Sequence, residues 1–371
     1  MNGKLLSAGL VGPFKAHGLA LVATAGKQGN RDMRLGRTKA FVATVFAVFG
    51  LACATSAAAQ EKFEWTMATP LTPAIGYLPL YQEMLDRIAG RSDGRLKITL
   101  LVYGQHPYSG ADIMNAVRDG ILQMGNSTDS YVTAQEPAIG FMALPFQFNS
   151  LAHAKAVYAA MKEPYFGELF DEKYNASMLT GFLVSGAAIH SDAPLNTLDA
   201  LDGRKIRVFG KESGRMIELL GGSPVTVAFG ELYTALQRGT INGALTGMVG
   251  AQAAKVYEVV NHNTWWNWSY ALEFVIVNKD ALKSLPEDLQ AIVREEAEIT
   301  NAELQALQDR LPAEILVESL EKYGIASTGL TPEMRRKFQE ATRPIIDDWI
   351  ASNGEAGKLA SELFASVNAS R

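Results

Sequence analysis

Residues Leu201–Gly247 read LDGRKIRVFGKESGRMIELLGGSPVTVAFGELYTALQRGTINGALTG. Three short runs in this stretch have the apolar character of β-strands: KIRV (Lys205–Val208), PVTVA (Pro224–Ala228) and INGAL (Ile241–Leu245). They continue a series that begins at SMLTGFLVSG (Ser177–Gly186). Because the runs are short and recur at intervals, they predict a sheet within an α/β fold.

An earlier series of the same kind precedes this stretch. Its short β-type runs alternate with helical patterns, in the order FEWTMA (Phe63–Ala68), a helical pattern over 77–88, LKITLL (Leu96–Leu101), a helical pattern over 111–119, and ILQMG (Ile121–Gly125). Such alternation is typical of sheets whose strands are mostly parallel. The two series together predict two sheets rather than one, and therefore two lobes.

A long helical pattern follows EFVIVN (Glu273–Asn278), a run typical of a buried strand. The pattern extends from about Pro286 to Tyr323, with a kink expected at Pro312, and it is too long for one small domain to cover. We expect this helix to brace both lobes. A further helix is expected to start at Thr331, where a capping residue is followed by proline.

The two halves are not separated by a repeat, a low-complexity tract or a flexible linker, so we expect the chain to cross between the lobes several times. The expected first lobe comprises residues 60–186 and about 272–311, and the second comprises residues 187–271 and about 312–371. Ligands of such folds usually bind in the crevice where strand ends meet.

The N-terminal region is expected to be an export signal. From Met33 the chain reads MRLGRTKAFVATVFAVFGLACATSAAAQ, in which basic residues precede the apolar run Ala40–Ala52 and a cleavage site of small residues at Ala57–Ala59. A membrane anchor would need ~20 apolar residues, which this run does not reach. We interpret residues 33–59 as a secretory signal peptide, and residues 1–32 as an upstream extension from a start codon assigned too early.

The mature chain from Gln60 is acidic and free of cysteine. The first 59 residues hold 7 of the 34 Lys and Arg but 1 of the 39 Asp and Glu, so the remainder carries a net charge of −11. With no basic cluster, a nucleic-acid partner is not expected. The single cysteine, Cys53, lies in the signal peptide, which excludes disulfides and Cys-ligated metals from the mature chain. We expect a periplasmic location.

The mature chain lacks the linear motifs of common enzymes. Its four histidines, His106, His153, His190 and His262, include no pair at the i, i+4 spacing of a helical metal site. A phosphate-binding loop, a dinucleotide-binding glycine motif and a G-x-S-x-G elbow are also missing from the sequence. We therefore expect a binding protein with no catalytic residue, cofactor or metal; a secreted hydrolase is the enzyme alternative.

Arg207 is the strongest candidate for a ligand contact. In KIRV the apolar Ile206 and Val208 share one face of the expected strand, which leaves Arg207 on the other. Near a strand end and beside Phe209, a fixed guanidinium could bind a carboxylate through two parallel hydrogen bonds. The alternative interpretation of Arg207 is a solvated charge at the edge of the sheet.

Aromatic residues form a second group of candidates. The segment Asn261–Phe274 reads NHNTWWNWSYALEF and contains three of the five tryptophans. If this segment is a strand, Trp266, Trp268 and Tyr270 share one face and could form an aromatic wall for a monocarboxylate with an apolar or aromatic body, whereas the alternative places them in the core. Further candidates lie in or after strand ends of the first lobe, namely Tyr103, His106, Tyr108, Thr128 and Tyr131.

Three motifs within the opening stretch carry a family resemblance. They are D-G-x-K-[IL]-R-V at Asp202–Val208, a G-x-S-P-V motif that ends at Val225, and E-x-Y-x-A-L-Q-x-G-x-[IV]-[DN]-G at Glu231–Gly243. In combination they resemble the DctP-type substrate-binding proteins of tripartite ATP-independent periplasmic (TRAP) transporters. The segments AVRDGILQMG (Ala116–Gly125), MALPF (Met142–Phe146) and LPEDLQ (Leu285–Gln290) are similar to family segments at comparable spacings.

The resemblance implies a two-lobed periplasmic binding protein that closes about a hinge, captures a small organic acid and delivers it to the small and large membrane subunits of a TRAP permease. It places the carboxylate-binding arginine of the family at Arg207 and two further pocket positions at Phe229 and Thr246. A second arginine of some relatives falls on Ala187, and the usual aspartate of the V-D-G turn is Asn242 here. A periplasmic sensor of the same fold that signals to a histidine kinase is the alternative.

Overall fold

The computed structural model describes residues 61–184 and 188–370. The expected upstream extension, the signal peptide with Cys53 and position Ala187 lie outside the described residues. Within the described ranges, no helix is both long and apolar enough to cross a membrane. The fold is α/β with two separate sheets, as predicted, but the run that opens the second predicted series forms β4 (Ala176–Leu183) of the first sheet.

The first sheet has five strands in the order β2-β1-β3-β10-β4. The strands are β1 (Phe63–Ala68), β2 (Leu96–Leu101), β3 (Met124–Thr128), β4 (Ala176–Leu183) and β10 (Leu272–Asn278). Two helices of this half, α2 (Leu78–Arg91) and α3 (Gly110–Arg118), pack against β2 and β3 respectively. All seven residues of β10 are buried, because the strand lies between two neighbours inside the sheet.

The second sheet has six strands in the order β11-β9-β5-β8-β6-β7. The strands are β5 (Ala188–Ser191), β6 (Lys205–Val208), β7 (Ser223–Thr226), β8 (Gly243–Thr246), β9 (His262–Trp265) and β11 (Ala326–Gly329). KIRV forms β6 and lies between β7 and β8, parallel to both. Arg207 is therefore on an inner strand and not at the edge of the sheet.

Both sheets contain more antiparallel pairing than the sequence pattern predicts. The antiparallel pairs recorded for the described strands all involve either β5 or β10. Each of these is the first strand that the chain forms after it passes from one sheet to the other. A strand that enters a sheet from the opposite half need not share the direction of the local β-α-β units. Here β5 and β10 are both antiparallel to their neighbours.

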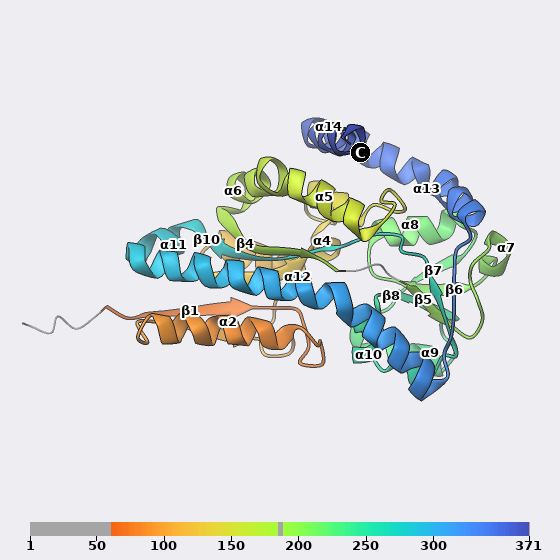
Figure 1. The fold of residues 1–371 in the computed structure, drawn as a ribbon, viewed down its shortest axis with the longest axis horizontal. Helices are drawn as coiled ribbons and strands as arrows, with labels where there is room; N and C mark the ends of the chain where they lie inside the picture. Colours follow the sequence, from red (N-terminus) through yellow and green to blue (C-terminus); the bar gives the residue numbers. More distant parts are fainter. Residues whose placement is uncertain (1–60, 185–187, 371) are drawn as a thin grey trace, which may run out of the picture. The chain divides into compact units, whose positions relative to one another are not determined.

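The helix α12 (Glu287–Tyr323) connects the two halves (Figure 1). It contacts β4 and α2 beside the first sheet, and it contacts α10 (Met248–Ala253) and the short helix η4 (Val256–Glu258) beside the second. The helix changes direction along its length (Figure 1), and Pro312 inside it cannot donate the intrahelical hydrogen bond. The structure thus confirms the predicted long helix that braces both lobes.

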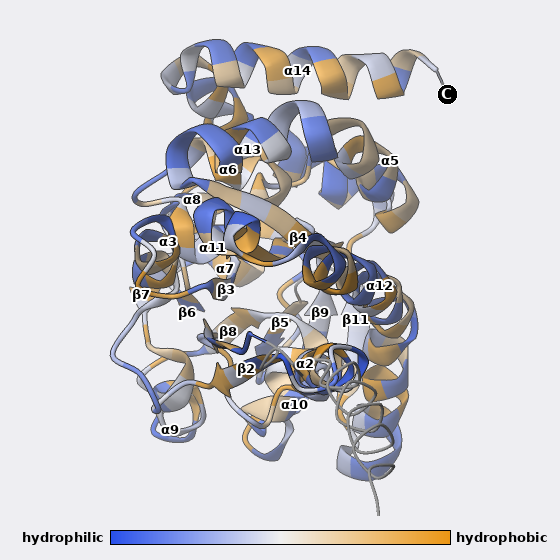
Figure 2. Cartoon of the chain, turned by 90° about the vertical axis from the view of Figure 1, so that its left-hand side faces the viewer, coloured by the Kyte–Doolittle hydropathy of each residue, from blue (hydrophilic) through white to orange (hydrophobic). Residues whose placement is uncertain are grey.

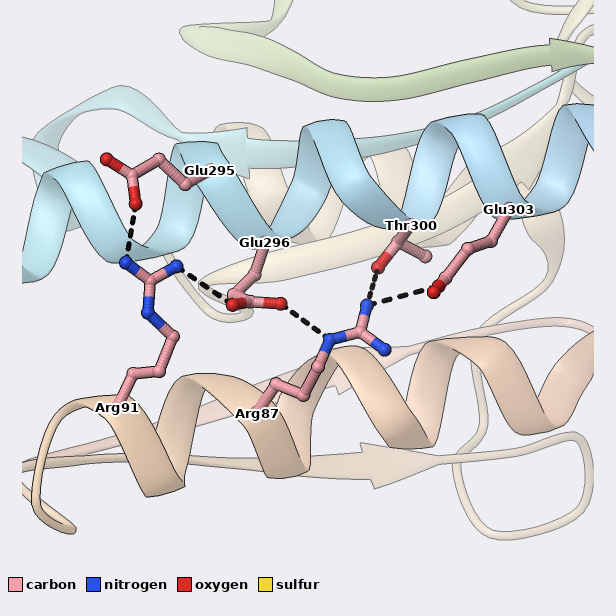
Figure 3. Close-up of polar contacts among 6 residues, drawn as sticks. All are labelled: Arg87, Arg91, Glu295, Glu296, Thr300 and Glu303. Carbon is pink, nitrogen blue, oxygen red and sulfur yellow. Dashed lines mark hydrogen bonds and ion pairs between the residues drawn. The ribbon is translucent and has the colours of Figure 1, made fainter.

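Ion pairs attach α12 to α2 (Figure 3). Arg87 Nε donates to Glu296 at 2.6 Å, and Arg91 Nη1 donates to the other oxygen of the same carboxylate at 2.9 Å. The Glu296 side chain is 3% exposed. Burial alone would raise the pKa of Glu296, but the hydrogen bonds from Arg91 and Arg87 bring it below its ordinary value. The pairs therefore hold the first half of α12 on the first lobe.

The C-terminal helices α13 (Pro332–Ser352) and α14 (Gly354–Ala369) cover other helices. α13 contacts α8 (Lys211–Leu219), and α14 contacts α5 (Leu151–Met161), which lies in the segment that we assign to the first lobe. Hydrophobic and hydrophilic residues alternate along α14 (Figure 2), and its apolar residues pack against the core. The remaining helices are α4 (Asp129–Val132), η1 (Pro137–Ala143), η2 (Lys162–Gly167), α6 (Glu168–Tyr174), α7 (Leu198–Leu201), η3 (Phe229–Glu231), α9 (Leu232–Gln237) and α11 (Lys279–Ser284).

Candidate functional site

A cavity of about 160 Å³ is lined by residues from both halves of the fold. The first half contributes Leu71, Ile75, Tyr77, Thr128, Ser130, Tyr131 and Glu273, and the second contributes Arg207, Phe209, Phe229 and the segment 246–250. Thr128 ends β3, Thr246 ends β8, and Arg207 is one residue from the end of β6. The cavity thus lies where the carboxyl ends of strands from both sheets meet, as expected for ligand sites in α/β folds.

The back of the cavity is formed by the connections between the lobes. Val184 directly follows β4, Ala271 directly precedes β10, and Pro312 lies within α12. All three residues line the cavity and are apolar. A molecule bound there therefore contacts the segments that must change conformation when two lobes close.

Arg207 is almost completely buried, with 4% of the residue exposed. Its Nε donates to the carbonyl of Val227 at 3.1 Å, and its Nη1 donates to the carbonyl of Leu245 at 3.2 Å. Burial lowers the pKa of Arg207, although a guanidinium remains charged. No carboxylate within the described residues forms an ion pair with it. Because a guanidinium has five N–H donors and two are used, three remain for a ligand.

Aromatic rings surround the guanidinium. The Arg207 carbon Cζ lies 5.4 Å from the centroid of the Phe209 ring. Phe229 and Tyr131 also line the cavity, so the charge is close to apolar surface. Desolvation raises the pKa of Tyr131, Arg207 lowers it, and Glu273 raises it, which places the Tyr131 side chain within the influence of both charges. The two carbonyls and the rings together fix the direction of the guanidinium.

Glu273 provides the opposite charge on the same cavity. The residue is 3% exposed and belongs to β10. One carboxylate oxygen accepts from Tyr77 Oη at 2.7 Å, and the other accepts from Tyr81 Oη at 3.3 Å and Asn126 Nδ2 at 3.2 Å. Burial raises the pKa of Glu273 to about 7, although these hydrogen bonds act in the opposite direction.

Glu273 is not among the site residues predicted from the sequence. It opens the run EFVIVN, which we interpreted as a buried strand. A signal was present, because a glutamate at the start of an otherwise apolar inner strand has to be paired or protonated when the strand is buried. The partners that make this possible come from α2 and β3, and sequence spacing does not reveal them.

Five of the predicted site residues come together at the cavity. They are Arg207, Phe229, Thr246, Thr128 and Tyr131. The first three come from the second half of the fold and the other two from the first. Gly250 of α10 also lines the cavity, and a Cβ atom at this position would lie 2.7 Å from Thr246 Oγ1. The helix therefore approaches Thr246 as closely as a glycine permits.

The predicted aromatic wall does not form. β9 ends at Trp265, and Asn267 has a φ of 44°, so the alternation of a strand does not continue through this segment. Trp266 is buried, and its Nε1 donates to the carbonyl of Leu195 at 2.8 Å. Trp266 is therefore a core residue, which is the alternative interpretation given above, and its ring also packs on Phe338.

The other candidates of the aromatic and first-lobe groups lie outside the cavity lining. Trp268 is buried and packs on Phe209, so it supports a cavity residue from behind. Tyr270 is buried against Phe148. Tyr103 is 62% exposed, because it lies in the loop after β2. His106 bonds through Nε2 to the carbonyl of Thr69 at 2.9 Å and stacks on Tyr108.

Comparison with known proteins identifies the family. Residues 68–353 match the model of DctP, the bacterial extracellular solute-binding protein family 7. The chain belongs to this family. The DctP relatives include a solute-binding protein of Sulfitobacter sp., which is 30% identical over 236 residues, or 63% of this chain and 69% of that protein. The ectoine/5-hydroxyectoine-binding periplasmic protein of Ruegeria pomeroyi is 25% identical over 87% of this chain and 96% of its own length.

Solved DctP structures share the fold. An extracytoplasmic solute receptor of Bordetella pertussis that binds pyroglutamic acid superposes with a TM-score of 0.76 at 20% sequence identity, over 82% of this chain and 99% of that one. The two-lobed α/β architecture predicted from the sequence is thus confirmed. These proteins are solute-binding receptors, and neither alternative, the sensor or the hydrolase, receives support from the comparisons.

Proposed function

We propose that this DctP protein captures a small organic acid in the cavity between its lobes, with Arg207 as the carboxylate-binding residue. The observation that carries the proposal is a nearly buried guanidinium, without an ion-pair partner in the described residues, that faces a cavity of about 160 Å³. Burying a charge costs free energy unless a partner compensates it. A ligand carboxylate supplies that partner and can accept two parallel hydrogen bonds from the guanidinium.

The contribution of Arg207 is large enough to decide whether binding is useful for uptake. A hydrogen bond to a charged group contributes about 1.5–3 kcal/mol, and a tenfold change in affinity corresponds to about 1.4 kcal/mol. A bidentate pair with Arg207 therefore separates micromolar from millimolar affinity. Phe229, Thr246, Thr128 and Tyr131 contact the body of the ligand in this proposal, because they line the same cavity.

In the proposed physiology the protein works in the periplasm, exported by the signal peptide that we assign to residues 33–59. Closure of the lobes around the ligand presents one continuous surface, which the small and large membrane subunits of a TRAP permease recognise. Family membership and the solute-binding relatives support this assignment. Genes for two membrane subunits beside the gene of this protein are the expected genomic context.

The proposal is tested by a thermal-shift screen of about a hundred organic acids, followed by calorimetry on the compounds that stabilise the protein. A ligand at 100 times its dissociation constant stabilises the folded state by about 2.7 kcal/mol. Arg207→Ala should abolish every such shift. The matched control is Arg204→Ala, because Arg204 lies just before β6 and pairs with Asp192 on the surface.

Wild-type affinity for an organic acid in Arg207→Ala would contradict the proposed function. Arg207→Lys provides a finer test, since lysine keeps the charge but lacks the planar fork. We expect its affinity to lie between those of the wild type and Arg207→Ala.

A further inference from the structure

The cavity carries two opposite charges that do not neutralise each other. Arg207 comes from β6 of the second sheet and Glu273 from β10 of the first. The recorded hydrogen bonds of Arg207 go to two backbone carbonyls, and those of Glu273 come from two tyrosines and an asparagine. Among the residues that the structure describes, no ion pair joins Arg207 to Glu273. Each charge therefore remains available to a ligand.

Glu273 retains capacity for one further donor. A carboxylate offers about four acceptor positions, two on each oxygen. Oε1 accepts from Tyr81 and Asn126, and Oε2 accepts from Tyr77 alone. The open position is thus on Oε2, and Glu273 itself lines the cavity. Every recorded partner of this carboxyl donates a hydrogen bond to it, which favours the charged form and offsets part of the effect of burial.

We propose that the ligand is a small zwitterion whose carboxylate pairs with Arg207 and whose cationic nitrogen pairs with Glu273. This inference rests on the proposed function and specifies its substrate class. A ligand that carries only a carboxylate would neutralise Arg207 and leave Glu273 as an uncompensated buried charge, so its binding would require uptake of a proton by Glu273. A zwitterion compensates both buried charges, and it binds Glu273 in the ionised form.

The rest of the cavity fits the apolar body of such a ligand. Phe209 and Phe229 come from the second half, and the connections contribute Val184, Ala271 and Pro312. Apart from the two charged residues, hydroxyl groups are the main polar side-chain groups of the lining. A compact ring or a short chain between the two charges would bury apolar surface there, whereas a polyhydroxylated acid needs a partner for each hydroxyl.

The zwitterion would also connect the two lobes. One of its charged groups bonds to β6 and the other to β10, so both bonds form together only when the lobes are close. The bond between the ligand nitrogen and Glu273 therefore stabilises the closed conformation relative to the open one. The acid–nitrogen pair, and not the carboxylate alone, would then determine which solute is presented to the permease.

The test uses matched pairs of ring acids that differ in one ring atom. Proline is compared with cyclopentanecarboxylate, and pipecolate with cyclohexanecarboxylate, by calorimetry on the wild type, Glu273→Gln and Glu296→Gln. We expect the nitrogen-containing member of a pair to bind at least tenfold more tightly to the wild type. In Glu273→Gln the preference should fall below threefold. Glu296→Gln, a change at another buried carboxyl that does not line the cavity, should retain it.

The direction of proton exchange provides a second measurement, in which the wild type is compared with Glu273→Gln because burial also raises the pKa of the neighbouring Asp129 to about 7. Titrations near pH 7 in buffers of different ionisation enthalpy report protons released or taken up. The zwitterion should release protons, because it stabilises ionised Glu273, and a simple carboxylate should cause uptake.

Two results would overturn the inference alone. One is equal or tighter binding of the carbocyclic acids; the other is Arg207-dependent binding found only for screened acids that contain no cationic nitrogen. If no organic acid of either kind binds in a manner that depends on Arg207, the proposed function fails together with the inference. The two failures are thereby distinguished.

Discussion

The buried carboxyl of Glu273 predicts an unusual pH dependence for the stability of the ligand-free protein. Burial raises the pKa of Glu273 from 4.5 to about 7 in the folded state. In the unfolded chain the carboxyl is solvated and returns to its ordinary value. The folded protein therefore binds the proton more tightly, so this stability contribution is complete below about pH 4.5 and is lost as the pH rises through about 7.

The magnitude follows from the difference in pKa. At about 1.4 kcal/mol for each tenfold change in proton affinity, the loss amounts to roughly 3 kcal/mol. Asp129 acts in the same direction, because burial also raises its pKa to about 7. Tyr77 and Tyr81 face the carboxyl but stay protonated, since burial and Glu273 raise their pKa values well above 10. His190 opposes the trend, because burial lowers its pKa to about 4.

Comparison with Glu273→Gln isolates the contribution of Glu273 from these other groups. Urea unfolding is measured for both proteins without ligand at intervals from pH 4.5 to 8. The difference in free energy of unfolding, wild type minus variant, should decrease by roughly 3 kcal/mol across this range, with most of the change between pH 5 and 7. Parallel pH profiles for the two proteins would refute the reasoning, because Glu273 would then titrate alike in the folded and unfolded states.

Three further outcomes follow from the contacts. Gly250→Ala should weaken ligand binding at least tenfold by calorimetry, because the new Cβ would lie 2.7 Å from Thr246 Oγ1; Gly90→Ala, which meets open space, should leave affinity unchanged. Glu296→Gln should lower the urea-unfolding free energy by about 1–2 kcal/mol, since Arg87 and Arg91 each lose one counter-charge but are partly exposed and keep their pairs with Glu303 and Glu295. Trp266→Phe should cost about 1 kcal/mol in thermal unfolding through the lost bond to a buried carbonyl, with unchanged ligand affinity.

The local elements of the fold follow from the sequence to a large extent. Short β-type runs such as KIRV and EFVIVN carry their own strand preference and appear as β6 and β10. The α12 pattern keeps its period over many turns and therefore needs no tertiary information, and it ends where Gly324 adopts a φ of 66°. The direction of the strands could be predicted less well from the sequence, because β5 and β10 enter their sheets from the opposite lobe.

The candidate site could be predicted from the sequence in part. The apolar neighbours of Arg207 in β6 determine which face its side chain takes, and the family motif adds Phe229 and Thr246. The tryptophan segment failed as a guide, because a single residue with positive φ, Asn267, ends the alternation that the aromatic wall requires. Asparagine tolerates a positive φ better than most residues, but one Asn does not by itself show that a strand ends there.

What the sequence determined by itself is therefore many of the strands and helices, the helix that spans both lobes, and the position of one arginine on a strand face. These depend on periodicity and on neighbours within a few residues. Only the tertiary structure decided that Glu273 faces the cavity that contains Arg207, with Tyr77, Tyr81 and Asn126 as its partners. The physical reason is that a buried charge is tolerated through groups distant in sequence, which come together only when the sheets and α2 are packed.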